Sequence, residues 1–599
     1  MTGVPSLPWF RRGGPIPYGS RIVVLLSVLT CLPGSASAEA QSLTPGAVDL
    51  APTFEAISVR ARFFGDGNAN ATAAVKFRKR GEAVWHDAYP PMIDRRERLG
   101  GAVNPYAFEA RGSIVGLASN TTYEVQVTWA DPDGIAGAQP GVATVTTLSY
   151  TPPTGGSTIT VTDDASLAVA LRSVSPGQTI HLNPGIYKAF TISRSGSSGA
   201  WISIEGAASG GSVVSGSGVS QNIAVNGNYI IIQNLTLSAS DFNGIVIARG
   251  RHHLFIQDNT LQNVSALCAN GPTTTHYSDT GILVGHDTSN IYVLRNAIHS
   301  PALNNPACIQ KTPWHGPGEG IGWTNVTTLV VKNNTVADAF RDAISADSET
   351  LGVNVDVTGN TVGGFVDDGI ESKGANVNTR LWGNTIIADK ADTCIAGNTN
   401  SPTIPYGPLY IFRNTCRVTT TNPSGTTVYK IYPGAPMYIF HNSVDSSLAN
   451  PRWDCYVMGG NGPFVVLNNI AVSSGSMIGR GASATATFDY NLGLVTTNAS
   501  YAYRWKGTTE YDSFAAFRNG TGQEAHGLNV APRFLDTGLR IGATSPAVDR
   551  GVILPNFNTL DSAWPYSGAA PDIGAFEVET SPARAPQRPS STHAAGTRR

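Results

Sequence analysis

Short phrases that end in asparagine recur along the middle of this chain and constrain its fold more than any other feature. Each has two or three residues of alternating apolar character followed by Asn, as in Val330-Val331-Lys332-Asn333-Asn334 and Ile411-Phe412-Arg413-Asn414. The intervals from Asn334 through Asn360, Asn384 and Asn414 to Asn442 are 26, 24, 30 and 28 residues. One coil of a three-sided parallel β-helix has about that length, so the repeat predicts a β-helix.

The recurring asparagine has two structural explanations. Its backbone tolerates the left-handed conformation of a tight turn, and stacked side-chain amides can hydrogen-bond in a ladder. We therefore predict that the Asn column is structural and not catalytic. The composition agrees: 65 glycines and only 14% charged residues suit many short strands joined by polar turns. The net charge of -2 gives no indication of nucleic-acid binding.

Two segments that flank the repeat resemble a known superfamily. Gly177-Gln178-Thr179-Ile180-His181-Leu182-Asn183-Pro184-Gly185-Ile186-Tyr187 resembles the opening of pectate-lyase-like β-helices. Ser545-Pro546-Ala547-Val548-Asp549 and Pro571-Asp572-Ile573-Gly574-Ala575-Phe576-Glu577 resemble the C-terminal cap of many secreted β-helix proteins. The resemblance implies an all-β protein with a right-handed parallel β-helix and its cap over residues 157–577.

The N-terminus resembles an export signal over residues 1–38. Basic Arg11, Arg12 and Arg21 precede or border an apolar run from Ile22 to Leu29, and Ala36-Ser37-Ala38 matches a small-x-small cleavage pattern. The run is far shorter than the ~20 residues of a spanning helix, so we expect a secreted protein, extracellular or periplasmic, with no membrane span. A lipid anchor at Cys31 is the alternative. We expect a monomer.

A smaller module precedes the β-helix over residues 43–148. Stretches such as Ala56-Ile57-Ser58-Val59-Arg60-Ala61 alternate as half-buried strands do. The phrase from Leu117 to Val125 resembles the fibronectin type III signature around its tyrosine corner, and Trp85 stands where that fold often keeps its core tryptophan. The resemblance implies a small β-sandwich that spaces or binds. At the other end, residues 581–599 have the composition of a disordered tail.

Five cysteines remain after removal of the signal: Cys268, Cys308, Cys394, Cys416 and Cys455. Export permits disulfides, and an odd number leaves at least one thiol free. Pairing of Cys268 with Cys308 and of Cys394 with Cys416 is one interpretation, and partly buried free cysteines are the other.

Acidic residues recur at one position of a second repeated phrase, which precedes the Asn of each coil. We expect the central Ile of this phrase to point into the core and its first and last residues to point outward, onto one sheet face. On successive coils, ~4.8 Å apart, the first position holds Glu319, Asp342 and Asp368, and Asp367 and Glu371 lie beside them. Such carboxylates repel each other unless a cation neutralises them. Oxygen ligands favour Ca²⁺ over Zn²⁺ or Mg²⁺, so we predict a Ca²⁺ site; solvated acidic coil edges are the alternative.

Asp342 and the phrase Asp367-Asp368-Gly369-Ile370-Glu371 one coil later resemble the calcium site of family 9 polysaccharide lyases. Glu371 replaces the family's last Asp, and Ile370 replaces its aromatic residue. The family's base lysine follows Gly-Phe, and the match here is Val428-Tyr429-Lys430, two coils on instead of one. The resemblance implies β-elimination on a uronic-acid polysaccharide with Lys430 as base. Lys373, two residues past Glu371, is the rival.

Several other residues are candidates for binding an acidic polysaccharide. Arg341 and Arg413 can clamp sugar carboxylates through two hydrogen bonds or form surface ion pairs. Trp314, His315 and Trp323 lie in or beside a Gly/Pro-rich insertion and either stack on sugar rings or pack within the loop.

Two other functions compete with the lyase. Asp367-Asp368-Gly369-Ile370 also resembles inverting glycoside hydrolases of the polygalacturonase type, which use paired carboxylates, but their Gly-His-Gly and Arg-Ile-Lys phrases are missing. A C5-epimerase is disfavoured because its Asp-Pro-His-Asp motif is absent. A non-catalytic adhesin or surface carbohydrate binder is the alternative outside enzymes.

Overall fold

The computed structural model describes residues 42–579 except 100, 265–278, 300–317, 339–340, 347–349, 391–392, 399–405, 420–426, 433–435, 450–452, 459–462, 483–485, 498–500 and 507. The predicted export signal, Cys31, Cys268, Cys308 and the predicted tail lie outside these residues. None of the helices within them is long and apolar enough to cross a bilayer.

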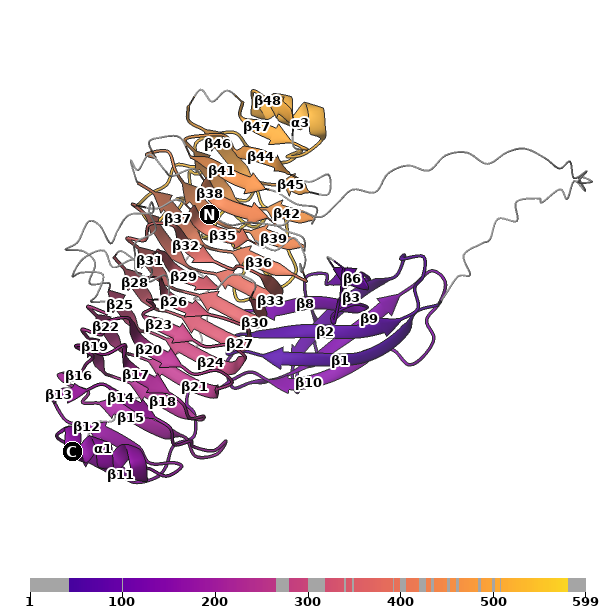
Figure 1. The fold of residues 1–599 in the computed structure, drawn as a ribbon. Coiled ribbons are helices and arrows are strands. Elements are labelled where there is room, and N and C mark those ends of the chain that lie inside the picture. Colours follow the sequence, from indigo (N-terminus) through magenta and orange to yellow (C-terminus); the bar gives the residue numbers. More distant parts are fainter. Residues whose placement is uncertain are drawn as a thin grey trace, which may run out of the picture.

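The repeat region forms a parallel β-helix with three stacked sheets, as predicted (Figure 1). Sheet 1 contains β11 Thr158–Val161, β12 Thr179–Leu182, β15 Ile202–Gly206, β18 Ile230–Gln233, β21 His252–Gln257, β24 Thr288–Leu294, β27 Val326–Lys332, β30 Leu351–Thr358, β33 Ala375–Trp382, β36 Leu409–Phe412, β39 Met437–Phe440, β42 Phe464–Leu467 and β45 Thr487–Asp489. Sheet 2 contains β13 Gly185–Lys188, β16 Ser212–Ser215, β19 Thr236–Ser238, β22 Thr260–Gln262, β25 Ala297–His299, β28 Thr335–Ala337, β31 Thr361–Gly363, β34 Thr385–Ala388, β37 Thr415–Val418, β40 Ser443–Asp445, β43 Ile470–Ser473 and β46 Leu492–Val495. Sheet 3 contains β14 Phe190–Ile192, β17 Gln221–Val225, β20 Asn243–Ile247, β23 Ile282–Val284, β26 Glu319–Trp323, β29 Asp342–Ala346, β32 Asp368–Glu371, β35 Thr393–Asn398, β38 Thr427–Tyr432, β41 Asp454–Met458, β44 Ile478–Ala482, β47 Tyr503–Trp505 and β48 Thr509–Tyr511.

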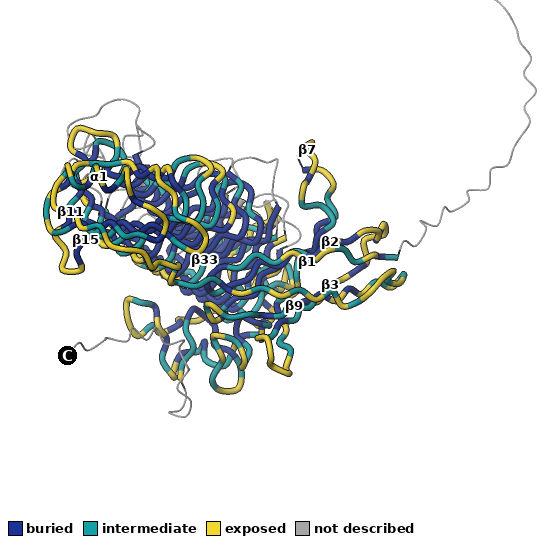
Figure 2. Tube along the Cα trace, turned by 90° about the horizontal axis from the view of Figure 1, so that it is seen from below, coloured by how far each residue is buried: buried dark blue, intermediate teal, exposed yellow. Residues whose placement is uncertain are grey.

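Aliphatic side chains fill the interior of the β-helix. Figure 2 shows that its stacked strands consist largely of buried residues. The predicted isoleucine column runs through sheet 3 in register and is fully buried, with Ile245, Ile282, Ile321, Ile344, Ile370 and Ile395. Helix α1 (Asp164–Ser173) packs on β11 and β12 at one end. The hairpin β47–β48 and helix α3 (Phe514–Thr521) lie at the other end, where Phe517 is buried.

The predicted asparagine ladder is present and is longer than the repeat phrases indicated. Its members are Asn259, Asn296, Asn334, Asn360, Asn384, Asn414, Asn442, Asn469 and Asn491. The backbone N and Nδ2 of each donate to the Oδ1 of the next at 2.9–3.1 Å. The ladder ends on the carboxylate of Glu524, which accepts both bonds from Asn491.

One part of the prediction was wrong. The left-handed residue of each turn is the one directly before the ladder asparagine, for example Asp258, Arg295, Gly359 and His441. The ladder asparagine is selected instead for its amide, because it must both donate and accept in a buried stack.

The N-terminal module folds as two small antiparallel sheets, as the β-sandwich prediction requires. One has the order β1 (Thr44–Pro52), β2 (Ala56–Phe64), β8 (Glu109–Val115), β5 (Met92–Asp94). The other has the order β10 (Gly141–Thr146), β9 (Thr122–Ala130), β3 (Thr72–Lys79), β4 (His86–Asp87). We call these two sheets, with the small hairpin formed by β6 (Arg98–Leu99) and β7 (Ala102–Val103), the sandwich.

The tyrosine predicted to mark a corner of the sandwich does so: Tyr123 Oη accepts a hydrogen bond from Ala118 N at 3.0 Å. The predicted core tryptophan was wrong. Trp85 lies half-buried beside the Arg78 guanidinium, and Trp129 occupies the core. Membership in the fibronectin type III family stays a prediction.

Cys394 and Cys416 form a disulfide inside the β-helix, which confirms that pairing. Cys455 is a buried free thiol.

Candidate functional site

The predicted acidic column lies on the outer face of sheet 3. Glu319 pairs with Asp342 in the register of β26 and β29, and Asp368 pairs with Thr393 in the register of β32 and β35. Ile344 pairs with Ile370, which sets Asp342 and Asp368 at the same position of adjacent strands. The parallel register thus brings successive acidic residues together, as the repeat predicted.

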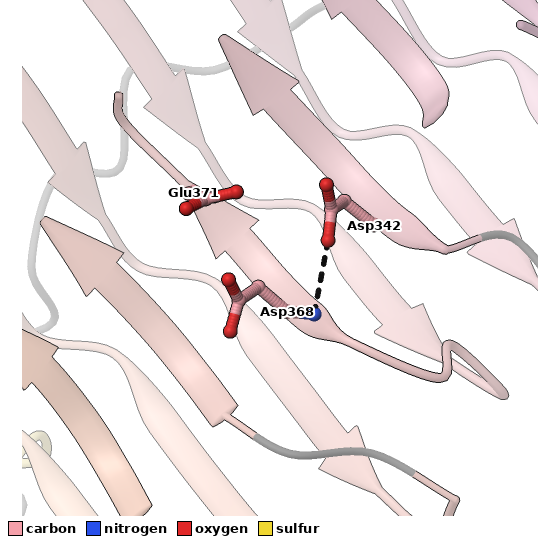
Figure 3. A group of neighbouring side chains, drawn as sticks. All are labelled: Asp342, Asp368 and Glu371. Carbon is pink, nitrogen blue, oxygen red and sulfur yellow. Dashed lines mark hydrogen bonds between the residues drawn. The ribbon is translucent and has the colours of Figure 1, made fainter. Parts of the chain in front are cut away.

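Asp342, Asp368 and Glu371 form a compact group, which we call the carboxylate triad (Figure 3). One carboxylate oxygen from each lies within 4.8 Å of the others, and all three residues are buried. Figure 3 shows the Asp368 backbone N donating to Asp342 Oδ1, at 3.1 Å. The triad draws on two adjacent strands, β29 and β32, so the fold positions it without any loop.

Three cationic side chains surround the triad. Lys430 Nζ lies 2.7 Å from Asp368 Oδ2, and Lys373 Nζ lies 2.5 Å from Glu371 Oε2 and 3.6 Å from Asp342 Oδ2. Arg341 pairs with Glu319 and, at 3.3 Å, with Asp342. Lys430 reaches the triad from β38, two strands beyond β32, because Glu371, Ala396 and Lys430 share one position of the register.

Among the described residues, the cations paired with the triad do not match its carboxylates one for one. The carboxylates of Glu319, Asp342, Asp368 and Glu371 lie against three cations, Arg341, Lys373 and Lys430, so one net negative charge remains within this set when all are ionised. Asp368 Oδ1 is buried without a hydrogen-bond partner among the described residues. Glu371 Oε2 receives no hydrogen bond of normal geometry either, although Lys373 Nζ is close.

The pKa values of the site groups respond first to burial and then to the neighbouring charges. Burial, followed by the Asp367 carboxylate, raises the pKa of Asp368 to about 6 against the opposing effect of Lys430. Burial and the charges of Asp368 and Asp342 raise the pKa of Glu371 well above its ordinary value. Burial alone would lower the pKa of Lys430, but the Asp368 and Glu371 carboxylates outweigh it and raise that pKa.

The triad fits a hard divalent cation. Two oxygens bound to one Ca²⁺ at 2.3–2.6 Å lie at most about 5.2 Å apart, and the triad oxygens satisfy that limit. The donors are all carboxylate oxygens, which hard cations prefer over Zn²⁺-type nitrogen and sulfur ligands. Three protein ligands would leave coordination positions for water or for a substrate carboxylate, since Ca²⁺ takes six to eight oxygens.

Glu319 and Asp367 lie beside the triad, and the compact group does not include them. Arg341 and the Thr280 hydroxyl both donate to Glu319. Asp367 is half-buried, and its backbone N donates to Arg341 O at 2.7 Å. The predicted direct ligation by these two carboxylates stays a prediction.

The structure does not bring two of the predicted substrate-binding residues to this group. Arg413 is buried under the C-terminal segment, where its guanidinium donates to Ala575 O and Phe557 O. Trp323 points into the core of the β-helix and is 2% exposed, so it cannot stack on a sugar. Trp314 and His315 lie outside the described residues.

Sequence reasoning missed two neighbours of the column. Thr280 stands one strand before Glu319 and donates to it at 3.2 Å. Asp279 is buried, and desolvation raises its pKa to about 7. The signal was available, because Thr280-Gly281-Ile282-Leu283 is the repeated phrase of that coil and Asp279 precedes it as Asp367 precedes Asp368.

Comparisons with known proteins are sparse. No protein-family model matches the sequence, and no curated protein sequence matches it. The β-helix resembles solved structures of the PL6 family alginate lyase AlyGC, with 12% identity, a TM-score of 0.39 and coverage of 64% of this chain and 55% of that one. It also resembles the catalytic domain of a GH87 alpha-1,3-glucanase in complex with nigerose, with 11% identity, a TM-score of 0.31 and coverage of 76% and 92%.

A third likeness is to the Dettilon tailspike protein, with 12% identity, a TM-score of 0.29 and coverage of 57% of this chain and 64% of that one. The chain therefore spans little more than half of the alginate lyase it matches. Likenesses this distant concern the fold alone and add no argument about chemistry.

Proposed function

We propose that this protein is a secreted polysaccharide lyase that cleaves a uronic-acid polymer by Ca²⁺-assisted β-elimination. The observation that supports this most is the buried carboxylate triad, with incompletely bonded oxygens and a lysine on each side. The triad and its lysines place a candidate cation site and a candidate base on the same outer face of sheet 3. The family 9 lyase assignment rests on the resemblance of the sequence motif.

A Ca²⁺ bound by the triad would hold the carboxylate of the sugar and make its C5 proton more acidic. Lys430 then removes that proton, and the C5–H electron pair forms the C4–C5 double bond. The C4–O bond breaks, and the leaving glycosidic oxygen takes up a proton from the Lys430 ammonium or from water. A base must be neutral when it acts. Lys430 loses its ion pair with Asp368 when that carboxylate ligates a cation, and the pKa of Lys430 then falls.

Lys373 remains the rival base. It lies in the turn after β32 and contacts two members of the triad, Glu371 and Asp342, where Lys430 contacts only Asp368. Its side chain is 15% exposed against 25% for Lys430. We assign the base to Lys430 because its amine is the more open to a substrate above sheet 3.

The test is product analysis on a panel of uronic-acid polymers, with polygalacturonate, alginate and glucuronan as substrates and absorbance of the unsaturated uronate as readout. Activity should require Ca²⁺ and disappear with a chelator. Lys430→Ala should lose about 10²–10⁴-fold in turnover, as loss of a positioned acid–base group does. Lys188→Ala is the matched control, because Lys188 is exposed on sheet 2. Saturated products would refute the elimination.

The hydrolase is the second candidate, and the phrase Asp367-Asp368-Gly369-Ile370 favours it. Inverting glycosidases hold their two carboxyl groups about 6.5–9.5 Å apart to admit a water. The triad oxygens lie within 4.8 Å of one another, which suits one shared cation better. An adhesin would bind the polymers without releasing any product.

A further inference from the structure

The sandwich packs tightly against the β-helix along sheet 1 (Figure 1). The buried Arg380 of β33 donates to Ser113 Oγ of β8, and Asn378 donates to Ser58 and Val59 of β2. Phe54 packs edge-on against Phe255 and Tyr292 of sheet 1. Buried, hydrogen-bonded contacts of this kind fix the orientation of the sandwich, so it is more than a flexible spacer.

One buried side chain of the sandwich reaches the coil that runs through the middle of the site. Arg111 is fully buried and donates to Tyr406 O at 2.5 Å and Gly407 O at 2.9 Å, while Asp94 balances its charge. Tyr406 and Gly407 follow β35 in the chain. β35 lies between β32, which carries Glu371, and β38, which carries Lys430. The sandwich thus holds the turn of the coil that separates the triad from its candidate base.

The β6–β7 hairpin rests on the same corner of the β-helix. Leu99 packs in a buried cluster with Val353, Ala375, Val377 and Tyr406. Ala375 is two residues past Lys373, a separation of at most about 7 Å in extended chain. The base of the hairpin therefore lies beside the edge of the candidate site, within reach of a short oligosaccharide bound there.

The outer part of the β6–β7 hairpin is exposed. Figure 2 shows β7 at a projecting edge of the sandwich, and Val103 is 69% exposed. Arg98 is exposed and donates one hydrogen bond, to Gly101 O, but forms no ion pair within the described part of the chain. Its neighbours Arg95 and Arg96 are paired with Asp66 and Asp94. Arg98 and the adjacent, exposed Glu97 are thus two charged side chains at this edge that form no ion pair among the described residues.

We infer that the β6–β7 hairpin forms a wall beside the polysaccharide-binding face of sheet 3, and that Arg98 binds a carboxylate of an acidic polysaccharide chain as it leaves the cation site. This inference rests on the proposed function for the identity of the polymer. The wall extends the binding surface from sheet 3 onto a second module. It gives the enzyme a preference for long acidic chains over short ones, because only a long chain spans both the triad and the hairpin.

The experiment measures binding of polygalacturonate and of alginate, with Ca²⁺ present, to the full-length Lys430→Ala protein, which does not consume them. Adding Arg98→Ala should weaken binding about two- to fivefold, the range of one exposed ion pair, and Arg98→Glu should weaken it further. Glu97→Gln, on the same hairpin, should leave binding unchanged or tighten it. Arg80→Ala, an exposed arginine elsewhere in the sandwich, should have no effect.

Kinetics on the enzyme with its lysine intact provide a second readout. Arg98→Ala should raise KM for the polymer and leave kcat and the KM for short oligosaccharides unchanged, since Arg98 does not touch the reacting atoms. Equal binding by the Lys430→Ala protein and by its Arg98→Ala and Arg98→Glu derivatives would refute the proposed contact between the hairpin and the polymer. Failure of the Lys430→Ala protein to bind either polymer would refute it too. Saturated products would refute the lyase activity. If binding nevertheless depends on Arg98, the proposed contact between the hairpin and the polymer is retained.

Discussion

Replacing Lys430 with the uncharged Met should tighten cation binding while it lowers turnover. In the structure the Lys430 ammonium lies 2.7 Å from Asp368 Oδ2, so it competes with a cation for that oxygen. Lys430→Met removes the competing charge and keeps most of the apolar length of the side chain. The same variant removes the proposed base, so affinity and activity should change in opposite directions.

The size of the effect follows from the geometry of the pair. Two unit charges about 4 Å apart interact by about 1 kcal/mol in bulk water and about 4 kcal/mol at an effective dielectric constant near 20. Lys430 is 25% exposed and Asp368 is 1% exposed, so solvent screens the pair in part. We expect the lower half of that range, about 1–2 kcal/mol, which corresponds to about 5- to 30-fold tighter Ca²⁺ binding.

Isothermal titration of Ca²⁺ into the metal-free wild type and Lys430→Met measures this directly. Lys373→Met should act in the same direction, because Lys373 contacts both Glu371 and Asp342. Lys188→Met, on sheet 2, is the control and should bind as the wild type does. Unchanged affinity in both site variants would refute competition between lysine and cation for the triad.

Three further predictions test the cation site and its scaffold. Asp368→Asn and Glu371→Gln should each abolish the rise in melting temperature that Ca²⁺ gives the wild type, since a ligand stabilises the state that binds it; a persistent rise would place the cation elsewhere. Asn414→Ala should lower the free energy of unfolding by about 4 kcal/mol, because it removes four buried hydrogen bonds worth about 1 kcal/mol each. The control, Asn519→Ala on the exposed face of α3, should leave the free energy of unfolding unchanged. Burial raises the pKa of Glu524 to about 8 from 4.5, so the folded state keeps a proton that the unfolded state releases. The free energy of unfolding should therefore fall as pH rises from about 4.5 to about 8, by a few kcal/mol at about 1.4 kcal/mol per pKa unit, and Glu524→Gln should flatten that part of the denaturation profile.

The sequence predicted the features that repeat from coil to coil. The Asn intervals and the alternation around each Ile determine the register of sheet 3, and this places Asp342 beside Asp368 and Lys430 two strands from Glu371. The inward direction of Trp323 was predictable by the same alternation, because it stands two residues after the core residue Ile321. Its place beside the Gly/Pro-rich insertion led instead to the prediction that Trp323 binds sugar.

Contacts between distant segments could not be predicted in this way. The buried Arg413 side chain donates hydrogen bonds to carbonyl oxygens 144 and 162 residues further along the chain, and no periodicity relates those segments. Arg111 meets Tyr406 across 295 residues and two modules. Such contacts depend on how the C-terminal segment and the sandwich pack on the finished β-helix. The sequence therefore predicted the group of carboxylates on sheet 3 but not the packing of the sandwich on the β-helix.

The two columns of this β-helix show why the acidic one points to function. The asparagine ladder and the acidic column have the same geometry, with one side chain per coil stacked in parallel register. An amide both donates and accepts, so the ladder satisfies itself and needs only Glu524 at its end. Ionised carboxylates only accept, so Asp342 and Asp368 on adjacent strands repel each other and depend on added positive charge. Arg341, Lys373 and Lys430 supply part of it. A divalent cation would supply the rest, which is why we propose that the acidic column is a functional site.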